Sequence, residues 1–382
     1  MLLTLSMKRP GIAVLTAFFT TVLMQALSAC PPTDGDGDGD GDGDGDGDGD
    51  GDGDGDGDGD GEPAAEALPV EDAAWQYTVV DGAICGNGDP VGVGTNRGTS
   101  SRLVIYLEGG GACWDDFTCS NGFAFFTDTG IPQSVIGQIE SLAVGIFSRT
   151  DADNPFTTDS FAYVPYCTGD VHAGTRAETP WGVAHVGANN LALMLPRILA
   201  TFPDVTEVVL AGTSAGGYGV AYHVEGLRQL LPATTSLSAI MDSSIPVAPF
   251  PGADAGVRAQ NLAWNPILCD GCGTANDQWL HAIDALPEVR FGLTQSLGDT
   301  TLRQYFSPSG VQLPREAWAT SVDAFFDEHE NKANVDVFEI DSDQHVFVYD
   351  TDLGTAVVDG TSVGAFYAGV VGDAAAVDAR SR

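Results

Sequence analysis

The sequence is poor in basic residues. Lys and Arg together number 15, against 54 Asp and Glu, and the formal net charge is -39 at pH 7. Because the phosphate backbone of nucleic acid would repel a chain this acidic, nucleic acid is excluded as a partner. Part of the charge comes from an unbroken Asp-Gly repeat over residues 34–61. The acidity of the remainder suits a protein that is soluble outside the cell.

Apolar runs long enough to span a bilayer are missing from the sequence after its first 29 residues. Residues 1–29 are predicted to be a signal peptide, because Lys8 and Arg9 precede an apolar stretch over residues 11–27. The stretch ends in Leu-Ser-Ala before Cys30, which resembles a bacterial lipoprotein processing box. Acylation of Cys30 would anchor the exported protein to a membrane of the cell envelope. The alternative is an ordinary secretory signal in which Cys30 is incidental.

The Asp-Gly repeat dominates residues 30–68. Glycine gives the backbone freedom and like charges repel, so residues 30–68 are predicted to form an extended, disordered linker. A structural calcium site is not expected, since strict two-residue alternation lacks the shaped loop that calcium ligands need. Residues 69–382 are then predicted to fold as one domain, with a length that is common for a decorated α/β enzyme.

Cysteine is also scarce, with seven residues in the chain. Apart from Cys30 their number is even, which favours up to three disulfides in an exported protein. Taking sequence neighbours first, the predicted pairs are Cys113–Cys119, Cys269–Cys272 and Cys85–Cys167. Other pairings and buried free thiols are alternatives. The CxxC spacing of the second pair lacks the further ligand pair of a zinc site, so no metal is expected.

Short apolar runs alternate with stretches of helical periodicity. The run at residues 103–107 is ended by glycines, as in a buried parallel strand, and apolar residues over 189–202 recur with helical spacing. Strands are predicted at residues 103–107, 161–166, 208–211, 238–241, 288–291 and 335–340, and helices at residues 189–202 and 215–231. This alternation predicts an α/β fold with a mostly parallel central sheet flanked by helices.

The strongest chemical motif is the pentapeptide from Gly212 to Gly216, which fits the pattern G-x-S-x-G around Ser214. It lies between a predicted strand and a predicted helix. A sharp turn at this place projects a hydroxyl from the sheet edge, and the flanking glycines give it room. The helix N-terminus behind the serine favours developing negative charge. We therefore predict Ser214 as the nucleophile of a serine esterase; the alternative is a Gly-rich turn with a capping serine.

A run of three glycines, Gly109 to Gly111, follows the predicted strand at residues 103–107. The N–H groups of such a run can face a substrate oxygen and stabilise the oxyanion of ester hydrolysis. The residue after the nucleophile supplies a further donor in α/β-hydrolases. The predicted oxyanion donors are therefore the N–H groups of Gly110, Gly111 and Ala215. A phosphate-binding loop is the rival, but the run lacks both the P-loop Lys-Ser/Thr and the spacing G-x-G-x-x-G.

A serine nucleophile needs a base, and the base needs an acidic group that orients it. The chain has six histidines, and the order along an α/β-hydrolase chain is Ser, acid, His. His345 is the best candidate for the base, because it follows the predicted strand at residues 335–340 in a loop. Asp242 and Asp299 both lie near strand ends between Ser214 and His345, so on these grounds both are candidates for the acid.

Taken together, these motifs resemble the pectin acetylesterase family, which includes the animal carboxylesterase Notum. The resemblance spans about residues 81–348, nearly all of the predicted domain. Its segments, in the order of the family, are Leu107–Trp114 with Cys119, Tyr166–Asp170, Gly187–Asn190, Gly212–Gly217, Asp242-Ser243, Gln295-Ser296 with Asp299, and Gln344-His345. Plant and animal members carry a Trp just after two glycines, whereas this chain has Gly111 there.

The resemblance implies an α/β-hydrolase fold without metal or cofactor. It also implies that Asp299 is the acid and that Asp242 is structural. The implied reaction is hydrolysis of a carboxylic ester through an acyl-enzyme on Ser214. The expected substrate is an acetyl or other short acyl ester, on a polysaccharide or a small molecule. A lipase-like esterase for longer acyl chains and a non-catalytic surface binding protein on the same scaffold are the rival hypotheses.

Overall fold

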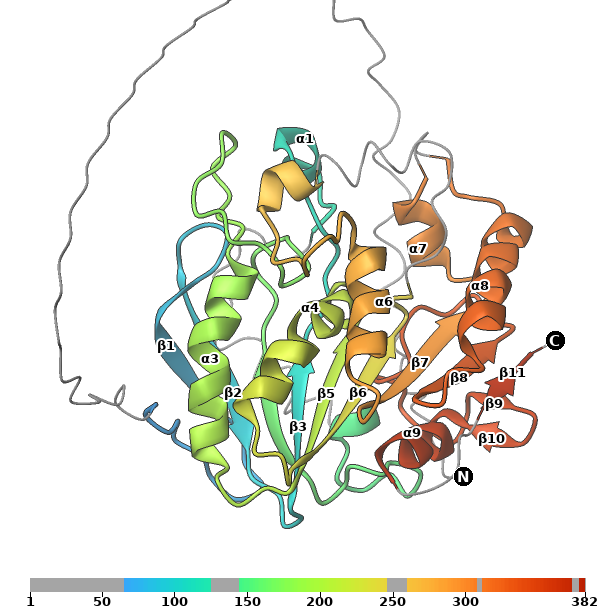
Figure 1. Ribbon diagram of the computed structural model, residues 1–382, viewed down its shortest axis with the longest axis horizontal. Helices are drawn as coiled ribbons and strands as arrows, with labels where there is room; N and C mark the ends of the chain where they lie inside the picture. The colour runs from blue at the N-terminus through green and yellow to red at the C-terminus, as the bar shows by residue number, and fades with distance from the viewer. Residues whose placement is uncertain (1–64, 125–143, 246–259, 308–310, 373–377, 382) are drawn as a thin grey trace, which may run out of the picture. The chain divides into compact units, whose positions relative to one another are not determined.

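The computed structural model describes residues 65–124, 144–245, 260–307, 311–372 and 378–381 (Figure 1). They belong to one unit that spans Gly61–Arg382. The predicted signal peptide, Cys30 and the Asp-Gly repeat lie outside the described residues. Among the helices that are described, none has the length and apolar character needed to cross a bilayer.

Within these residues the core is a sheet of nine strands in the order β1-β2-β4-β3-β5-β6-β7-β8-β11. The strands are β1 (Gln76–Ile84), β2 (Pro90–Asn96), β3 (Arg102–Leu107), β4 (Ser160–Val164), β5 (Glu207–Thr213), β6 (Ser236–Asp242), β7 (Arg290–Ser296), β8 (Val335–Ile340) and β11 (Ala379–Arg380). From β4 to β11 all neighbours pair in parallel, whereas β1 with β2 and β2 with β4 are antiparallel. The expected fold class, a mostly parallel sheet flanked by helices, is confirmed.

Alternate residues of each central strand face opposite sides of the sheet. On β3, Leu103 and Ile105 pack in one apolar cluster, while Val104 and Tyr106 pack in another. The helices on the first face are α3 (Gly187–Thr201), α4 (Ala215–Leu230), α6 (Ala275–Ala285) and α8 (Arg315–His329) (Figure 1). The second face is covered by α9 (Val363–Val371), by the short helix η1 (Gly145–Phe147) and by residues that follow His345. The sheet is therefore buried on both faces, as parallel sheets require.

The predicted parallel strands and helices agree with these elements. The runs at 208–211, 238–241 and 335–340 lie within β5, β6 and β8, and the two predicted helices correspond to α3 and α4. The run at 161–166 ends earlier, at Val164. The bounds predicted for the strand at 288–291 are wrong, because β7 continues through Thr294 to Ser296. These last residues are polar but buried, and an apolar pattern cannot reveal them.

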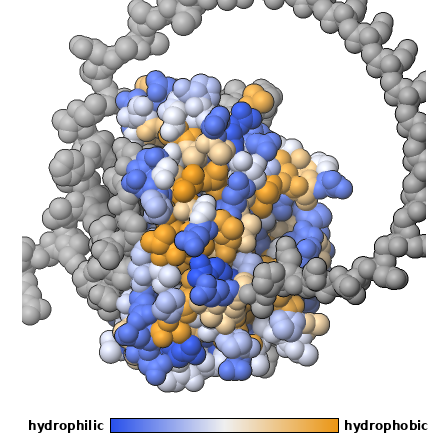
Figure 2. Space-filling view, turned by 90° about the vertical axis from the view of Figure 1, so that its left-hand side faces the viewer, coloured by the Kyte–Doolittle hydropathy of each residue, from blue (hydrophilic) through white to orange (hydrophobic). Residues whose placement is uncertain are grey.

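Strands β1 and β2, at one edge of the sheet, carry no clear apolar run and are not among the predicted elements. β1 lies at the sheet edge, and only two of its nine residues are buried; Val79 is 44% exposed. Leu193 on the neighbouring α3 is 41% exposed. Figure 2, which views this side of the molecule, shows apolar side chains interleaved with hydrophilic ones. Such a mixed surface gives neither a buried run nor a regular alternation.

Three disulfides join the six cysteines of the described residues. They are Cys85–Cys167, Cys113–Cys119 and Cys269–Cys272, the pairs predicted from the sequence. The first ties the end of β1 to the segment after β4 across 82 residues of chain. The second joins the end of the glycine run to helix α1 (Asp116–Ser120), and the third closes a short loop before α6. The first closes the longest loop and therefore restricts the unfolded chain most.

Candidate active site

Ser214 lies on the sharp turn between β5 and α4. Its φ of 51° and ψ of -120° are strained for a residue with a side chain. Its N–H donates to the carbonyl of Asp242 at 2.8 Å, which fixes the turn against the end of β6. Ser214 occupies the N-cap position of α4, yet its side chain makes no capping hydrogen bond. The hydroxyl therefore does not serve as a helix cap, which is also true of the serine in a nucleophile elbow.

The glycines around Ser214 are required by close backbone contacts. A Cβ atom on Gly212 would lie 2.3 Å from the carbonyl oxygen of Gly216. A Cβ atom on Gly216 would lie 2.0 Å from the carbonyl oxygen of Leu107, at the end of β3. No side chain fits at either place, so the G-x-S-x-G pattern reflects how tightly this turn packs on the sheet.

The glycine run lies directly against this turn. A Cβ atom on Gly109 would lie 2.4 Å from the Thr213 carbonyl oxygen and 3.1 Å from the Ser214 Cβ. Gly111 has a φ of 76°, and a Cβ atom there would lie 2.0 Å from the Phe123 carbonyl oxygen. The backbone of this chain therefore leaves no space for a Trp at position 111. This is the physical basis of the departure from the family pattern.

Three N–H groups beside Ser214 are those predicted to form the oxyanion hole. Among the described residues, the N–H groups of Gly110, Gly111 and Ala215 donate to no protein acceptor. The loop that carries the first two is fixed by the Tyr166 hydroxyl, which donates to the Gly111 carbonyl at 2.9 Å. Free N–H groups on a fixed loop are what stabilisation of an oxyanion requires.

His345 and Asp299 come together in the structure. The His345 Nδ1 lies 2.8 Å from Oδ2 of Asp299, and the two side chains are 17% and 0% exposed. Asp299 follows β7 and caps helix α7 (Thr300–Tyr305), whose Leu302 N–H donates to Oδ1 at 2.9 Å. The Gln295 amide donates to Oδ2, also at 2.9 Å. With Nδ1 donating to a carboxylate, Nε2 is the ring nitrogen left to accept a proton.

Ser214 and His345 are linked through the end of β6 and make no direct hydrogen bond within the described residues. Asp242 accepts the Ser214 N–H with its carbonyl, and its Oδ2 accepts the N–H groups of Phe347 and Val348 at 2.6 and 2.9 Å. One residue therefore positions both the serine turn and the histidine loop. Hydrogen bonds between nucleophile and base are often absent before substrate binds.

Two residues next to Asp242 complete this support, and the sequence analysis gave them no such role. The Thr294 hydroxyl donates to Oδ1 of Asp242 at 2.6 Å, and Ser243 Oγ accepts the Val346 N–H at 3.0 Å. Burial raises the pKa of Asp242, and these donors together with the two loop N–H groups oppose the rise. The Asp242-Ser243 step is thus structural, as the resemblance implied, and it holds the loop of His345.

Glu108, between β3 and the glycine run, is a further residue that the sequence analysis did not single out. Its Oε2 accepts the Tyr166 N–H at 2.9 Å. Burial raises the pKa of Glu108 to about 7, against the opposing hydrogen bonds of Tyr166 and Tyr163. Next to it, the Tyr106 hydroxyl bonds to Thr213 Oγ1 at 2.7 Å, one residue before Ser214. A buried polar network thus lies beneath the serine turn; the position of Glu108 beside the glycines was its only sequence signal.

Four of the five other histidines have polar partners other than Asp299, and the fifth, His329, packs on Trp279 and Phe325. His172 Nε2 lies 2.8 Å from the Glu108 carbonyl, and His223 Nε2 lies 2.7 Å from the His172 carbonyl. Burial lowers the pKa of both rings to about 4, so both are neutral at pH 7. His185 bonds to the Thr168 carbonyl, and His281 pairs with Glu225 at 3.2 Å. None of these four contacts Asp299 among the described residues, which favours His345 as the base.

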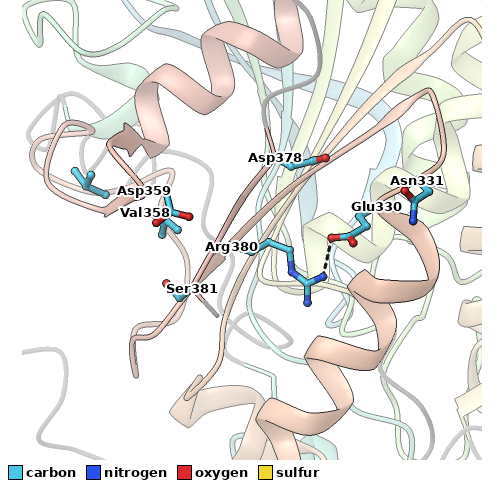
Figure 3. Close-up of a pocket in the computed structure, with 8 residues that line it drawn as sticks. Glu330, Asn331, Val358, Asp359, Asp378, Arg380 and Ser381 are labelled. Carbon is cyan, nitrogen blue, oxygen red and sulfur yellow. Dashed lines mark hydrogen bonds and ion pairs between the residues drawn. The ribbon is translucent and has the colours of Figure 1, made fainter.

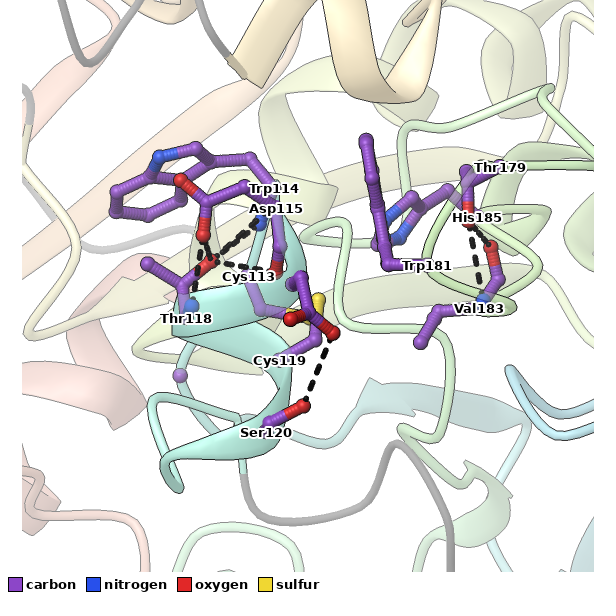
Figure 4. Close-up of a disulfide and its surroundings, with 12 residues drawn as sticks. Cys113, Trp114, Asp115, Thr118, Cys119, Ser120, Thr179, Trp181, Val183 and His185 are labelled. Carbon is purple, nitrogen blue, oxygen red and sulfur yellow. Dashed lines mark hydrogen bonds between the residues drawn. A yellow bond between two sulfur atoms is a disulfide. The ribbon is translucent and has the colours of Figure 1, made fainter. Parts of the chain in front are cut away.

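Seven aromatic side chains gather in one cluster with Ala215, and we call them the aromatic wall. They pack together with Ala112 and Ala215, and they are Trp114, Tyr166, Trp181, Tyr218, Tyr222, Trp264 and Tyr305. Figure 4 shows Trp114 next to the Cys113–Cys119 disulfide, with Trp181 and His185 on its other side. The wall borders the predicted oxyanion hole, where an ester substrate would lie.

Two groups of metal-binding residue types occur among the described residues, and neither forms part of this site. Cys113 and Cys119 lie near His185, but both sulfurs are in the disulfide. The carboxylates of Asp151, Asp153 and Asp352 lie within 4.8 Å of one another near the surface. Asp151 and Asp352 already accept the N–H groups of Leu353 and Gly354. These acids order the loops that carry them.

A cavity of about 720 Å³ lies at the β8–β11 edge of the sheet, and no candidate catalytic residue lines it (Figure 3). Arg380 of β11 is its central side chain. The guanidinium bonds Asp327, Glu330 and Glu339 at 2.6, 2.7 and 3.0 Å. Burial raises the pKa of Glu339 to about 7, opposed by Arg380. This ion-pair group fastens the last strand to β8 and α8, far along the sheet from Ser214.

Known proteins resemble this chain in sequence and in fold. The family model described as pectinacetylesterase matches residues 65–247, which contain the glycine run and Ser214. The palmitoleoyl-protein carboxylesterase notum2 of Xenopus laevis is 32% identical over 145 residues, and NOTUM of Homo sapiens is 26% identical over 170 residues. These matches cover 36% and 42% of this chain but only 29% and 33% of the two relatives. The chain thus matches about a third or less of their length.

A solved structure has a similar fold. The Wnt deacylase Notum from Drosophila superimposes with a TM-score of 0.61 at 16% identity, over 81% of this chain and 96% of that one. An identity this low shows the common fold alone. The family model, the curated relatives and this structure thus agree on one likeness: the chain is similar to the pectin acetylesterase family in sequence and to the Notum carboxylesterases in sequence and fold.

Proposed function

We propose that this protein is a serine carboxylesterase that removes acetyl or other short acyl groups through an acyl-enzyme on Ser214. The observation that carries the proposal is the hydrogen bond of 2.8 Å between Asp299 and His345, at the same sheet edge as the strained Ser214 turn. Carboxylesterases among the relatives support the reaction class. A buried carboxylate that orients an imidazole is the arrangement that activates a serine.

In the first half of the reaction, Ser214 Oγ attacks the ester carbonyl. His345 Nε2 takes the hydroxyl proton and passes it to the departing alcohol, while Asp299 holds the imidazole by Nδ1 and stabilises its charged form. The carbonyl oxygen becomes an oxyanion as the tetrahedral intermediate forms, and collapse of the intermediate breaks the bond to the alcohol oxygen and leaves the acyl group on Ser214. The N–H groups of Gly110, Gly111 and Ala215 are placed to stabilise that charge.

In the second half, water replaces the alcohol. His345 accepts a proton from the water as it attacks the acyl carbon, and the same oxyanion donors hold the second tetrahedral intermediate. Collapse of the intermediate breaks the bond to Ser214, and His345 returns the proton to Oγ. Each step is a proton transfer, an addition to a carbonyl or the collapse of a tetrahedral intermediate, and His345 carries the proton throughout.

The substrate class is part of the proposal. The family is described as pectinacetylesterase, which supports an acetyl ester on a polysaccharide. The relatives are palmitoleoyl-protein carboxylesterases, which favours longer acyl chains as the second candidate. The aromatic wall beside Ala215 offers apolar surface to either group. Aryl esters with acyl chains of graded length would decide: the proposal expects acetyl to be hydrolysed fastest, with a steady decline as the chain grows.

Replacing the nucleophile tests the mechanism. Ser214→Ala should lower kcat by several powers of ten while the protein stays folded, because only the oxyanion donors and substrate binding are left. Thermal unfolding of both proteins checks the fold. If Ser214→Ala hydrolysed the ester at the rate of the wild type, Ser214 would not be the nucleophile and the proposal would be wrong. Binding of acetylated polysaccharide without hydrolysis by the wild type would instead favour the non-catalytic binding protein.

We further propose that the domain acts outside the cytoplasm, tethered through an acylated Cys30 and the Asp-Gly linker. The three disulfides fit an oxidising compartment. Cys30→Ser should move the protein from the membrane fraction to the soluble exported fraction, and a fatty-acid label should be lost with it. An unlabelled wild type in the soluble exported fraction would favour the ordinary secretory signal.

A further inference from the structure

Tyr305 has a buried hydroxyl without a hydrogen-bond partner. A buried polar atom of this kind costs stability, and in a native protein it needs a reason. Other unpartnered side-chain atoms in the described residues include Trp279 Nε1 on α6 and Tyr367 Oη on α9. Tyr305 differs from these two because its ring belongs to the aromatic wall beside Ala215.

The position of Tyr305 connects the two halves of the candidate active site. It ends α7, the short helix that begins immediately after Asp299. Its ring packs edge-to-face on Trp114 at 6.1 Å, and Trp114 follows the glycine run. The next residue, Phe306, stacks on the buried Trp318 at 6.1 Å and so anchors the end of the helix. The phenol therefore lies between the Asp299 helix and the oxyanion loop, on a fixed backbone.

The surroundings of the hydroxyl are aromatic. Burial raises the pKa of the Tyr305 phenol far above its usual range, and the nearby Tyr218 phenol adds to the rise. The Tyr218 hydroxyl donates to the Ile245 carbonyl at 3.3 Å, and the Tyr166 hydroxyl donates to the Gly111 carbonyl at 2.9 Å. Of Tyr166, Tyr218 and Tyr305, only Tyr305 has a hydroxyl that donates to no acceptor among the described residues. It stays protonated at neutral pH, so it acts as a donor.

We propose that Tyr305 determines substrate specificity by donating a hydrogen bond to a hydroxyl on the alcohol part of the ester, next to the scissile bond. The inference rests on the proposed esterase function and sharpens its substrate class. An acetyl group has no polar atom beyond its carbonyl, so a partner for the phenol must belong to the alcohol. A sugar with free hydroxyls beside its ester provides one, whereas an aliphatic alcohol leaves the phenol unpaired.

The selectivity expected from one such contact follows from the asymmetry of hydrogen-bond energetics. Pairing the phenol with a substrate hydroxyl gains a hydrogen bond, whereas covering it with methylene groups leaves a buried donor unpaired. Wild type should therefore prefer an ester with a neighbouring hydroxyl by about tenfold in kcat/KM over the same ester without it. The contact is made by the bound substrate before reaction, so the preference should appear mainly in KM.

A matched pair of substrates tests the inference: cyclohexyl acetate, and the monoacetate of a vicinal cyclohexanediol. The two differ by one hydroxyl next to the ester. Tyr305→Phe removes only the phenol oxygen, and it should abolish the preference by raising KM for the hydroxylated ester about tenfold. The rate on cyclohexyl acetate should stay within about twofold. Tyr77→Phe is the matched control and should keep the preference, because it removes a phenol on the distant strand β1 that accepts the Gly92 N–H of β2.

The outcomes separate the inference from the function on which it rests. A wild type that hydrolyses neither ester would contradict the proposed function and this inference together. An active wild type with no preference between the two esters would overturn the role of Tyr305 alone. So would a Tyr305→Phe variant that loses activity on both esters equally, since that result describes a structural residue.

Discussion

Two buried carboxylates lie at the ends of the neighbouring strands β6 and β7, and they bind different kinds of group. Asp242 accepts main-chain N–H groups of Phe347 and Val348 together with the Thr294 hydroxyl. Asp299 accepts the Nδ1–H of the His345 ring. Both side chains are fully buried, and both precede the histidine in the chain; Asp242 is the last residue of β6, and Asp299 follows β7.

The difference shows that the two carboxylates at this sheet edge hold different parts of the proposed catalytic histidine, His345. Asp242 fixes the backbone of the loop, and through its carbonyl it also fixes the Ser214 turn. Asp299 fixes the orientation and tautomer of the imidazole itself. Loss of the first carboxylate should mainly affect folding, and loss of the second should mainly affect catalysis. The predictions below test that division.

The largest effect on catalysis is expected for Asp299→Asn. The amide would favour the wrong imidazole tautomer, with the proton on Nε2, so kcat should fall on the order of 10⁴-fold. The asparagine oxygen can still accept the Leu302 N–H, so the cap of α7 is kept. Steady-state kinetics together with a thermal melt would measure both. A variant that keeps a tenth of the wild-type kcat would contradict the assignment of Asp299.

Asp242→Asn should show the opposite balance. One oxygen of Asp242 accepts two N–H groups and the other accepts hydroxyls, so an amide in this place leaves a buried donor unmatched. The free energy of unfolding should fall by about 1–3 kcal/mol. The kcat should fall only about tenfold, through a looser His345 loop. Chemical denaturation and kinetics on the same sample measure the two effects. A loss of kcat equal to that of Asp299→Asn would contradict the different roles assigned to the two carboxylates.

A smaller effect is expected for Ser243→Ala, which removes the acceptor of the Val346 N–H next to His345. The free energy of unfolding should fall by about 1 kcal/mol, and kcat should change by a few-fold at most. Urea denaturation compared with Ser236→Ala, at the exposed start of β6, provides the control. Equal losses in the two variants would mean that the histidine loop gains nothing from Ser243.

The smallest effect on catalysis is expected at Glu108, where pH dependence is the measurable quantity. Because burial raises its pKa from about 4.5 to about 7, the folded state binds a proton that the unfolded state has lost across this range. The contribution of Glu108 to stability is therefore full below about pH 4.5 and is lost as the pH rises to about 7. When the pH is raised from 5 to 8, the Tm of Glu108→Gln should therefore fall less than the Tm of the wild type. Parallel Tm curves for the two proteins would contradict this.

Much of the fold follows from local patterns in the sequence. The central strands are buried on both faces, so continuous apolar runs such as those at 208–211 and 335–340 mark them. Strand β1 is mostly exposed or partly exposed, and β2, although buried, alternates valine with glycine, so neither has a continuous apolar run. The polar end of β7 is invisible for a related reason: its buried Thr294 and Gln295 serve the carboxylates of Asp242 and Asp299.

Local sequence patterns likewise reveal some residues of the candidate site and not others. Ser214 and the glycine run are local motifs, because close backbone contacts require glycine at fixed positions. The choice between Asp242 and Asp299 depends on which carboxylate meets the ring and which meets the loop. That is a contact between segments 46 residues apart, and local patterns do not contain it. The family resemblance implied Asp299, and in the structure Oδ2 of Asp299 lies 2.8 Å from His345 Nδ1.

The most direct test of the central claim is covalent labelling of the active protein with a fluorophosphonate, which reacts with activated serines. The account predicts one adduct, found by mass spectrometry on the peptide that contains Ser214, with loss of esterase activity in proportion to labelling. Asp299→Asn should label far more slowly, and Ser214→Ala should not label at all. An adduct on another serine, or full activity after Ser214 is labelled, would contradict the account.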